Sequence, residues 1–121
     1  MPDYVAAAKG NQAWVAWRRR DLSVAEQRGQ EALGLWRESP LMYPFQWQAL
    51  WPVLAVALAQ GRDEEAWAHV QALLEPTQQR LPDRLNSVLE AALQARTERQ
   101  AGAARHHLDR ARELAQEMGY L

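Results

Sequence analysis

The chain contains no cysteine, no isoleucine and only two threonines. The lack of cysteine excludes disulfide bonds, thiol catalysis and zinc sites built on cysteine. Because β-branched side chains favour strands, their scarcity argues against a sheet. The chain is instead rich in alanine and leucine, with 22 and 16 residues, and these residues favour helices. The sequence therefore predicts an all-α fold, organised as a single domain over residues 1–121.

An excess of charge of one sign and a long apolar run are also missing. Fourteen basic residues face fifteen acidic ones, for a net charge of −1, so we expect no broad electrostatic binding to nucleic acid or membrane. The longest uncharged apolar run, residues 49–59, has 11 residues, whereas a membrane helix needs ~20. Residues 1–4 lack the basic and apolar parts of a signal peptide. We expect a cytoplasmic protein.

Proline, glycine and capping residues divide the chain into six expected helices. They span about residues 3–20, 23–37, 43–60, 63–75, 82–100 and 102–119. Asp3 is expected to cap the first helix, and Ser23 with Glu26 matches a capping box at the start of the second. Gly61 is expected to end the third helix, because glycine readily adopts the left-handed conformation that closes many helices.

Pro52 lies inside the third expected helix, where it removes a backbone donor and clashes with the carbonyl group of Gln48. A kinked helix is one solution, and a helix that begins at Pro52 after a loop is the other. We favour the kink because four apolar residues keep a helical spacing across the break: Phe45, Leu50, Leu54 and Leu58.

Small or apolar residues recur three times along the chain at successive spacings of 3, 9, 4 and 3. Two residues three apart lie on one helix face, and the gap of nine spans a tight turn before the next helix. The three sets are Ala13, Ala16, Ala25, Gly29 and Ala32; Leu54, Ala57, Ala66, Val70 and Leu73; and Ala92, Ala95, Ala104, Leu108 and Ala111.

This series resembles the tetratricopeptide repeat, although the units are offset by 41 and 38 residues against the consensus of ~34. The resemblance implies three helix–turn–helix repeats, at about residues 3–39, 43–76 and 82–119. Their six antiparallel helices would stack into a right-handed superhelix. Loose, alanine-rich units also resemble the repeat regions of large bacterial signalling proteins, namely maltose-activator-type transcription regulators and multidomain adenylate cyclases. That likeness implies a scaffold in signalling or transcription regulation, and a segment of a larger protein.

In that family the first helix of each repeat lines a concave groove. Large aromatic side chains and arginine are strong anchors for a partner. The resemblance therefore implies a non-enzymatic module that binds a peptide or protein in its groove. The alternative for the tryptophans is that they fill space left by the alanines, and Trp36 and Trp67 are expected to pack between units. Matched position by position, the groove residues are Trp14, Trp17, Arg18, Gln48, Trp51, Asn86 and Arg96.

We expect no catalytic residues, no metal site and no cofactor. His106 and His107 are adjacent in the sequence and so point about 100° apart on a helix, which makes them a poor metal pair. His69 is expected on a polar helix face. A carboxylate cluster, residues 63–65, is explained by its place at the positive end of a helix. The second hypothesis for function is a structural module that forms a homodimer through the apolar ends of its solenoid.

Overall fold

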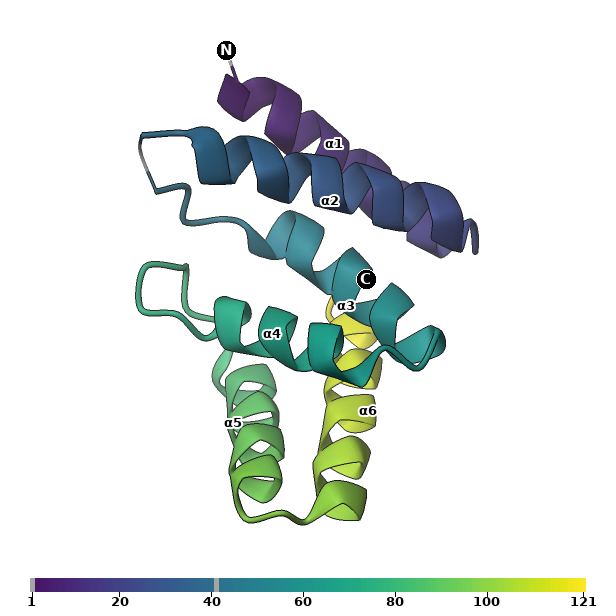
Figure 1. The fold of residues 1–121 in the computed structure, drawn as a ribbon, viewed down its shortest axis with the longest axis vertical. Helices are drawn as coiled ribbons and strands as arrows, with labels where there is room; N and C mark the ends of the chain where they lie inside the picture. Colours follow the sequence, from purple (N-terminus) through teal and green to yellow (C-terminus); the bar gives the residue numbers. More distant parts are fainter. Residues whose placement is uncertain (1, 41) are drawn as a thin grey trace.

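The computed structural model describes residues 2–40 and 42–121, and these residues form six helices and no strand (Figure 1). The all-α prediction is confirmed for this part of the chain. No helix in it is long and apolar enough to cross a bilayer. The helices are α1 (Pro2–Arg18), α2 (Leu22–Glu38), α3 (Trp47–Ala59), α4 (Asp63–Leu73), α5 (Asp83–Thr97) and α6 (Ala101–Glu117).

The helix ends differ from the predicted caps at two places. The carboxylate of Asp21 accepts a hydrogen bond from the backbone N–H of Val24 at 3.2 Å, so Asp21 caps α2. Ser23 therefore lies inside α2, and the predicted capping box was wrong. Asp3 lies within α1 and not before it. The predicted stop at Gly61 is confirmed, since this residue has φ +72° just after α3.

Helix α3 continues through Pro52, which excludes a helix that begins there. It starts at Trp47 and not near residue 43, because the preceding backbone is held by the α4–α5 loop. The N–H of Gln79 donates to the carbonyl of Pro44 at 2.8 Å. The side-chain amide of Gln78 accepts a hydrogen bond from the backbone N–H of Gln46 at 3.0 Å. It also donates to the backbone carbonyl of Tyr43 at 2.9 Å. These bonds replace the first turn of a longer helix.

Helices α1, α2 and α3 form a close-packed unit at one end of the molecule (Figure 1). Helix α2 runs antiparallel to α1, and α3 packs on both. The approach of α2 to α3 depends on Gly29, because a Cβ atom there would lie only 2.3 Å from Cγ1 of Val53. The small side chain of Ala13 completes this contact from α1.

The α5–α6 hairpin forms the other end and runs across the direction of α4 (Figure 1). Its buried leucines join the same apolar core as the first three helices. Beyond α6 the chain returns to the middle of the molecule, and its C-terminus lies beside α3 (Figure 1). All fifteen residues of the three spaced sets are buried, so the series marks the positions where the helices pack.

Candidate functional site

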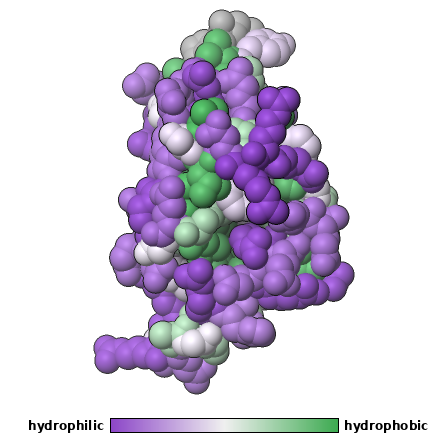
Figure 2. All heavy atoms as spheres, turned by 90° about the vertical axis from the view of Figure 1, so that its right-hand side faces the viewer, coloured by the Kyte–Doolittle hydropathy of each residue, from purple (hydrophilic) through white to green (hydrophobic). Residues whose placement is uncertain are grey.

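A cleft of about 750 Å³ lies between the C-terminal ends of α1 and α3 and one side of α6. Its apolar lining comes from segments far apart in the sequence, since Trp17 and Leu22 meet Leu58 and Leu121 there. The side of the molecule that carries the α1–α2 and α3–α4 turns shows a narrow apolar strip between hydrophilic side chains (Figure 2). The charged lining of the cleft is Arg18, Arg20, Arg105, Asp109, Arg112 and Glu113.

The charges around the cleft are unevenly matched. Arg105 pairs with Asp109 at 3.0 Å and with Asp63 at 3.2 Å, and Glu113 pairs with Arg110 at 3.2 Å. Two further arginines in the lining, Arg20 and Arg112, form no ion pair with any described residue. The cleft therefore combines an apolar floor with unneutralised positive charge at its rim.

A smaller pocket of about 320 Å³ lies on the other side of α1. Its walls are the rings of Trp14, Trp47 and Tyr120, and Gln48 contributes its amide. The indole N–H of Trp14 and the side-chain oxygen of Gln48 are buried without a hydrogen-bond partner among the described residues. Such atoms are rare in folded proteins, because each costs roughly 1–3 kcal/mol.

Residues 119–121, which follow α6, separate the cleft from the pocket. Tyr120 packs edge-on against Trp47 with ring centroids 4.9 Å apart, and it lies 6.2 Å from the ring of Trp51. Leu121 is fully buried, and its backbone oxygen accepts a hydrogen bond of 2.6 Å from Arg18. The guanidinium of Arg18 also stacks on Trp14 at 4.4 Å. The space between α1 and α3 is thus filled from within the molecule.

The seven predicted groove residues do not form one surface. Trp14 and Gln48 line the small pocket, whereas Trp17 and Arg18 line the cleft. Trp51 is 0% exposed, so its assignment to an open groove was wrong and the packing alternative holds for this residue. Trp36 and Trp67 are also buried, as expected for residues that pack between units.

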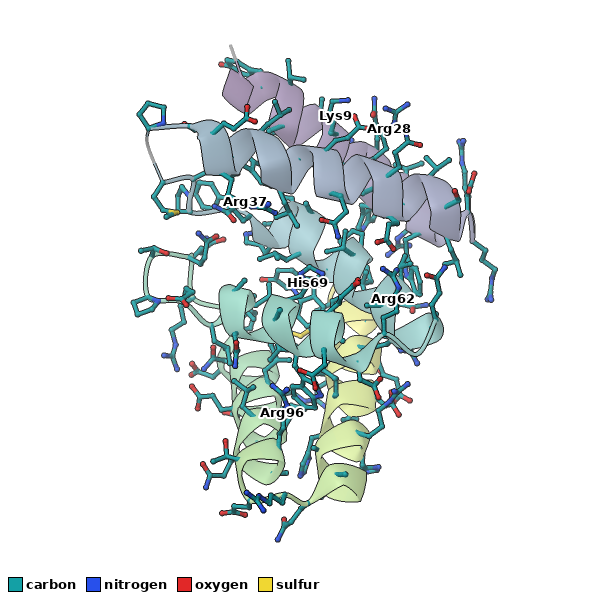
Figure 3. The ribbon with its side chains drawn as sticks, viewed as in Figure 1. Lys9, Arg28, Arg37, Arg62, His69 and Arg96 are labelled. Atoms are coloured by element: carbon teal, nitrogen blue, oxygen red, sulfur yellow. The ribbon has the colours of Figure 1, made fainter. Side chains whose placement is uncertain are left out.

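The two predicted groove residues of α5 lie apart from both cavities. Asn86 is buried, and its amide donates to Glu90 at 2.7 Å. Arg96 lies toward α4 (Figure 3), where its guanidinium stacks over Trp67 at 5.1 Å and pairs with Glu64 at 2.9 Å. Neither side chain lines the cleft or the pocket, and both act in local packing.

Sequence reasoning missed the contribution of α6 and of the residues after it. Arg105 and Arg112 gave no signal, because arginine on an amphipathic helix ordinarily faces solvent. A signal did exist for Tyr120 and Leu121. They follow Gly119, which has φ +88° just after α6, and an apolar residue after such a glycine usually packs back on the protein.

His69, predicted on a polar helix face, is half-buried among charged side chains. It lies with Arg62 on the side of α4 that faces α2 and α3 (Figure 3). Burial lowers the pKa of His69 below its ordinary value, against the opposing effect of the nearby carboxylates of Glu65 and Glu26. The hydrogen bonds from Arg62 hold the pKa of the Glu26 carboxyl below its usual range. This cluster joins α2 to α4, and none of its residues lines the cleft.

Among the residues that the structure describes, no three histidine or carboxylate side chains come together as a metal site. No protein-family model matches the chain, and no curated protein or solved structure shows significant similarity to it. The likeness to the tetratricopeptide repeat therefore rests on the spaced residues themselves.

Proposed function

We propose that this protein is a non-enzymatic module that binds a peptide or protein segment in the cleft between α1, α3 and α6. The main support for this proposal is the composition of the cleft, which has an apolar floor beside Arg20 and Arg112. Neither arginine forms an ion pair with a described residue. A partner segment with apolar and acidic residues would bury its apolar side chains against the floor and pair its carboxylates with the two arginines. We further propose a cytoplasmic role as a scaffold in bacterial signalling or transcription regulation, either alone or as a segment of a larger regulator.

The proposed architecture behind this function is a tetratricopeptide-like superhelix of three repeats. Two observations support it. All fifteen spaced residues are buried, and α3 packs on both α1 and α2, as the first helix of a second repeat would. In such an arrangement the first helices of successive repeats share one concave surface, and the cleft would form part of it.

Panning a random dodecapeptide display library on the immobilised protein tests the proposal. We expect selected peptides to lose affinity about ten-fold for the double variant Arg20→Glu, Arg112→Glu, because two attractive charges at the rim become repulsive. The matched control is Arg84→Glu, Arg99→Glu, which makes the same change of charge at exposed positions outside the cleft. Equal losses in the two variants, or the absence of any selected peptide, would contradict binding in the cleft.

A homodimer is the second candidate, and two exposed apolar residues of α1 favour it. Tyr4 is 74% exposed and Val5 is 48% exposed at the end of the molecule formed by α1 and α2. Pairing of two such ends would cover both residues. Light scattering separates the candidates, since a monomer has a mass of 13.8 kDa and self-association would double it.

A further inference from the structure

The segment Gly119–Tyr120–Leu121, hereafter the tail, lies between the proposed binding cleft and the small pocket. Leu121 lines the cleft, whereas Gly119 and Tyr120 line the pocket. Tyr120 lies against Trp47 and Trp51, and the oxygen of Leu121 is held by Arg18. These contacts come from α1 and α3, the two helices that the repeat pattern assigned to a groove surface. The tail therefore sits as a bound ligand would sit.

The tail is attached to α6 through a single turn. Helix α6 ends at Glu117, and Gly119 then adopts φ +88°, a conformation that favours glycine. A Cβ atom at Gly119 would meet no atom within 4 Å. Two hydrogen bonds also hold the tail to the end of α6, because the N–H groups of Tyr120 and Leu121 donate to the carbonyl of Ala115 at 2.8 and 3.3 Å. Departure of the tail therefore breaks these two bonds at the last turn of α6.

The fit between the tail and its surroundings leaves polar atoms unsatisfied. The indole N–H groups of Trp14 and Trp51 and the side-chain oxygen of Gln48 are buried without partners among the described residues. All three residues border the tail or the pocket that it closes. An extended segment offers backbone N–H and C=O groups along its length, so a longer ligand would satisfy atoms that the tail leaves unpaired.

We infer that the tail is an exchangeable occupant of the groove, and that the partner binds by displacing it with a segment of the same chemistry, an aromatic residue followed by an aliphatic one. This inference rests on the proposed function and adds the class of partner and its competition with the tail. While the tail is docked the groove is closed to the partner. The apparent affinity of the partner is therefore its affinity for the open groove multiplied by the fraction of molecules in which the groove is open.

The probe is a fluorescent hexapeptide with the sequence of residues 116–121, added to the whole 121-residue chain and followed by anisotropy. Its control carries alanine in place of the tyrosine. We expect weak binding to the wild-type chain, and much tighter binding to the double variant Tyr120→Ala, Leu121→Ala, whose groove lacks its internal ligand. The control peptide should bind neither.

A second variant weakens the docked tail without changing any groove side chain. Gly119→Ala places a side chain at positive φ, which costs ~1–2 kcal/mol for a residue with a Cβ atom. We therefore expect it to raise the apparent affinity for the probe peptide about ten-fold. Gly102→Ala is the matched control, since it also meets open space but has no positive φ, and it should bind as the wild type does.

If Gly119→Ala binds the probe no better than Gly102→Ala, the tail is a fixed part of the core and the inference is overturned. This comparison is decisive even where the double variant fails to fold, because Gly119→Ala truncates no buried side chain. Selected library peptides that bind the cleft without competing with the hexapeptide would also overturn the inference, while leaving the proposed function intact. Library peptides that compete with the hexapeptide support both.

Discussion

Two helix contacts of this molecule, one inside the α1–α3 unit and one between α4 and the α5–α6 hairpin, are built in different ways. Helix α2 lies so close to α3 that Gly29 has no room for a Cβ atom beside Val53. The α5–α6 hairpin instead meets α4 through large side chains, with Arg96 stacked over Trp67 and paired with Glu64. A contact between small residues is sensitive to added volume, whereas a contact between large residues is sensitive to lost volume. The α2–α3 interface is therefore expected to be disrupted by a larger side chain, and the interface between α4 and the α5–α6 hairpin by a smaller one.

The largest effect is expected at the α4–α5 contact. Trp67→Ala removes a buried ring and should lower the free energy of unfolding by ~3–5 kcal/mol. Because Trp67 joins the hairpin to the middle, amides of α5 should lose protection from hydrogen exchange before those of α1 and α2. Trp67→Phe is the control, since it keeps an aromatic ring and should lose less. Uniform loss of protection across all helices would mean that the two ends unfold as one unit.

An intermediate effect is expected at the α2–α3 contact. Gly29→Ala should destabilise the protein by about 1–2 kcal/mol, because the strain of overpacking exceeds the gain in helix propensity. Gly34→Ala lies on the same helix, where a Cβ atom meets nothing within 4 Å, and it should stabilise by up to ~1 kcal/mol. Urea unfolding followed by circular dichroism measures both. The same sign for the two variants would refute the close approach of α2 to α3.

The smallest effect is expected from pH at the contact between α2 and α4. The pKa of His69 is lowered in the folded chain by burial, whereas an unfolded histidine titrates near ~6.5. Below pH ~6.5 the unfolded chain therefore binds a proton at residue 69 more readily than the folded chain does. The free energy of unfolding is highest above pH ~6.5. It falls as the pH is lowered from there to the pKa of His69 in the folded chain. Thermal melts between about pH 7.5 and pH 5.5 should show a declining Tm, and the decline should be smaller in His69→Gln. Identical slopes for the two proteins would argue against a buried neutral histidine.

The helices and their buried faces were predictable because their signals are local. Gly61 marked the end of α3, and the three spaced sets marked residues that are all buried. The residues around the groove were less predictable because their environment is set by distant segments. Trp51 has the position of a groove residue but is covered by Tyr120, and no pattern near Trp51 indicates that contact. The start of α3 moved for a similar reason, since Gln78 and Gln79 hold the residues before it.

The contact between Arg18 and Leu121 has a consequence for synthesis of the protein in the cell. It joins residues 103 positions apart, and a ribosome that adds ~5–20 residues per second takes on the order of ten seconds to cover that distance. During this interval α1, α2 and α3 can associate, but the rings of Trp47 and Trp51 still lack the residues that cover them. The nascent chain would then present an apolar surface to chaperones until Tyr120 and Leu121 emerge. Closure of this part of the core therefore comes after α1, α2 and α3 have been synthesised.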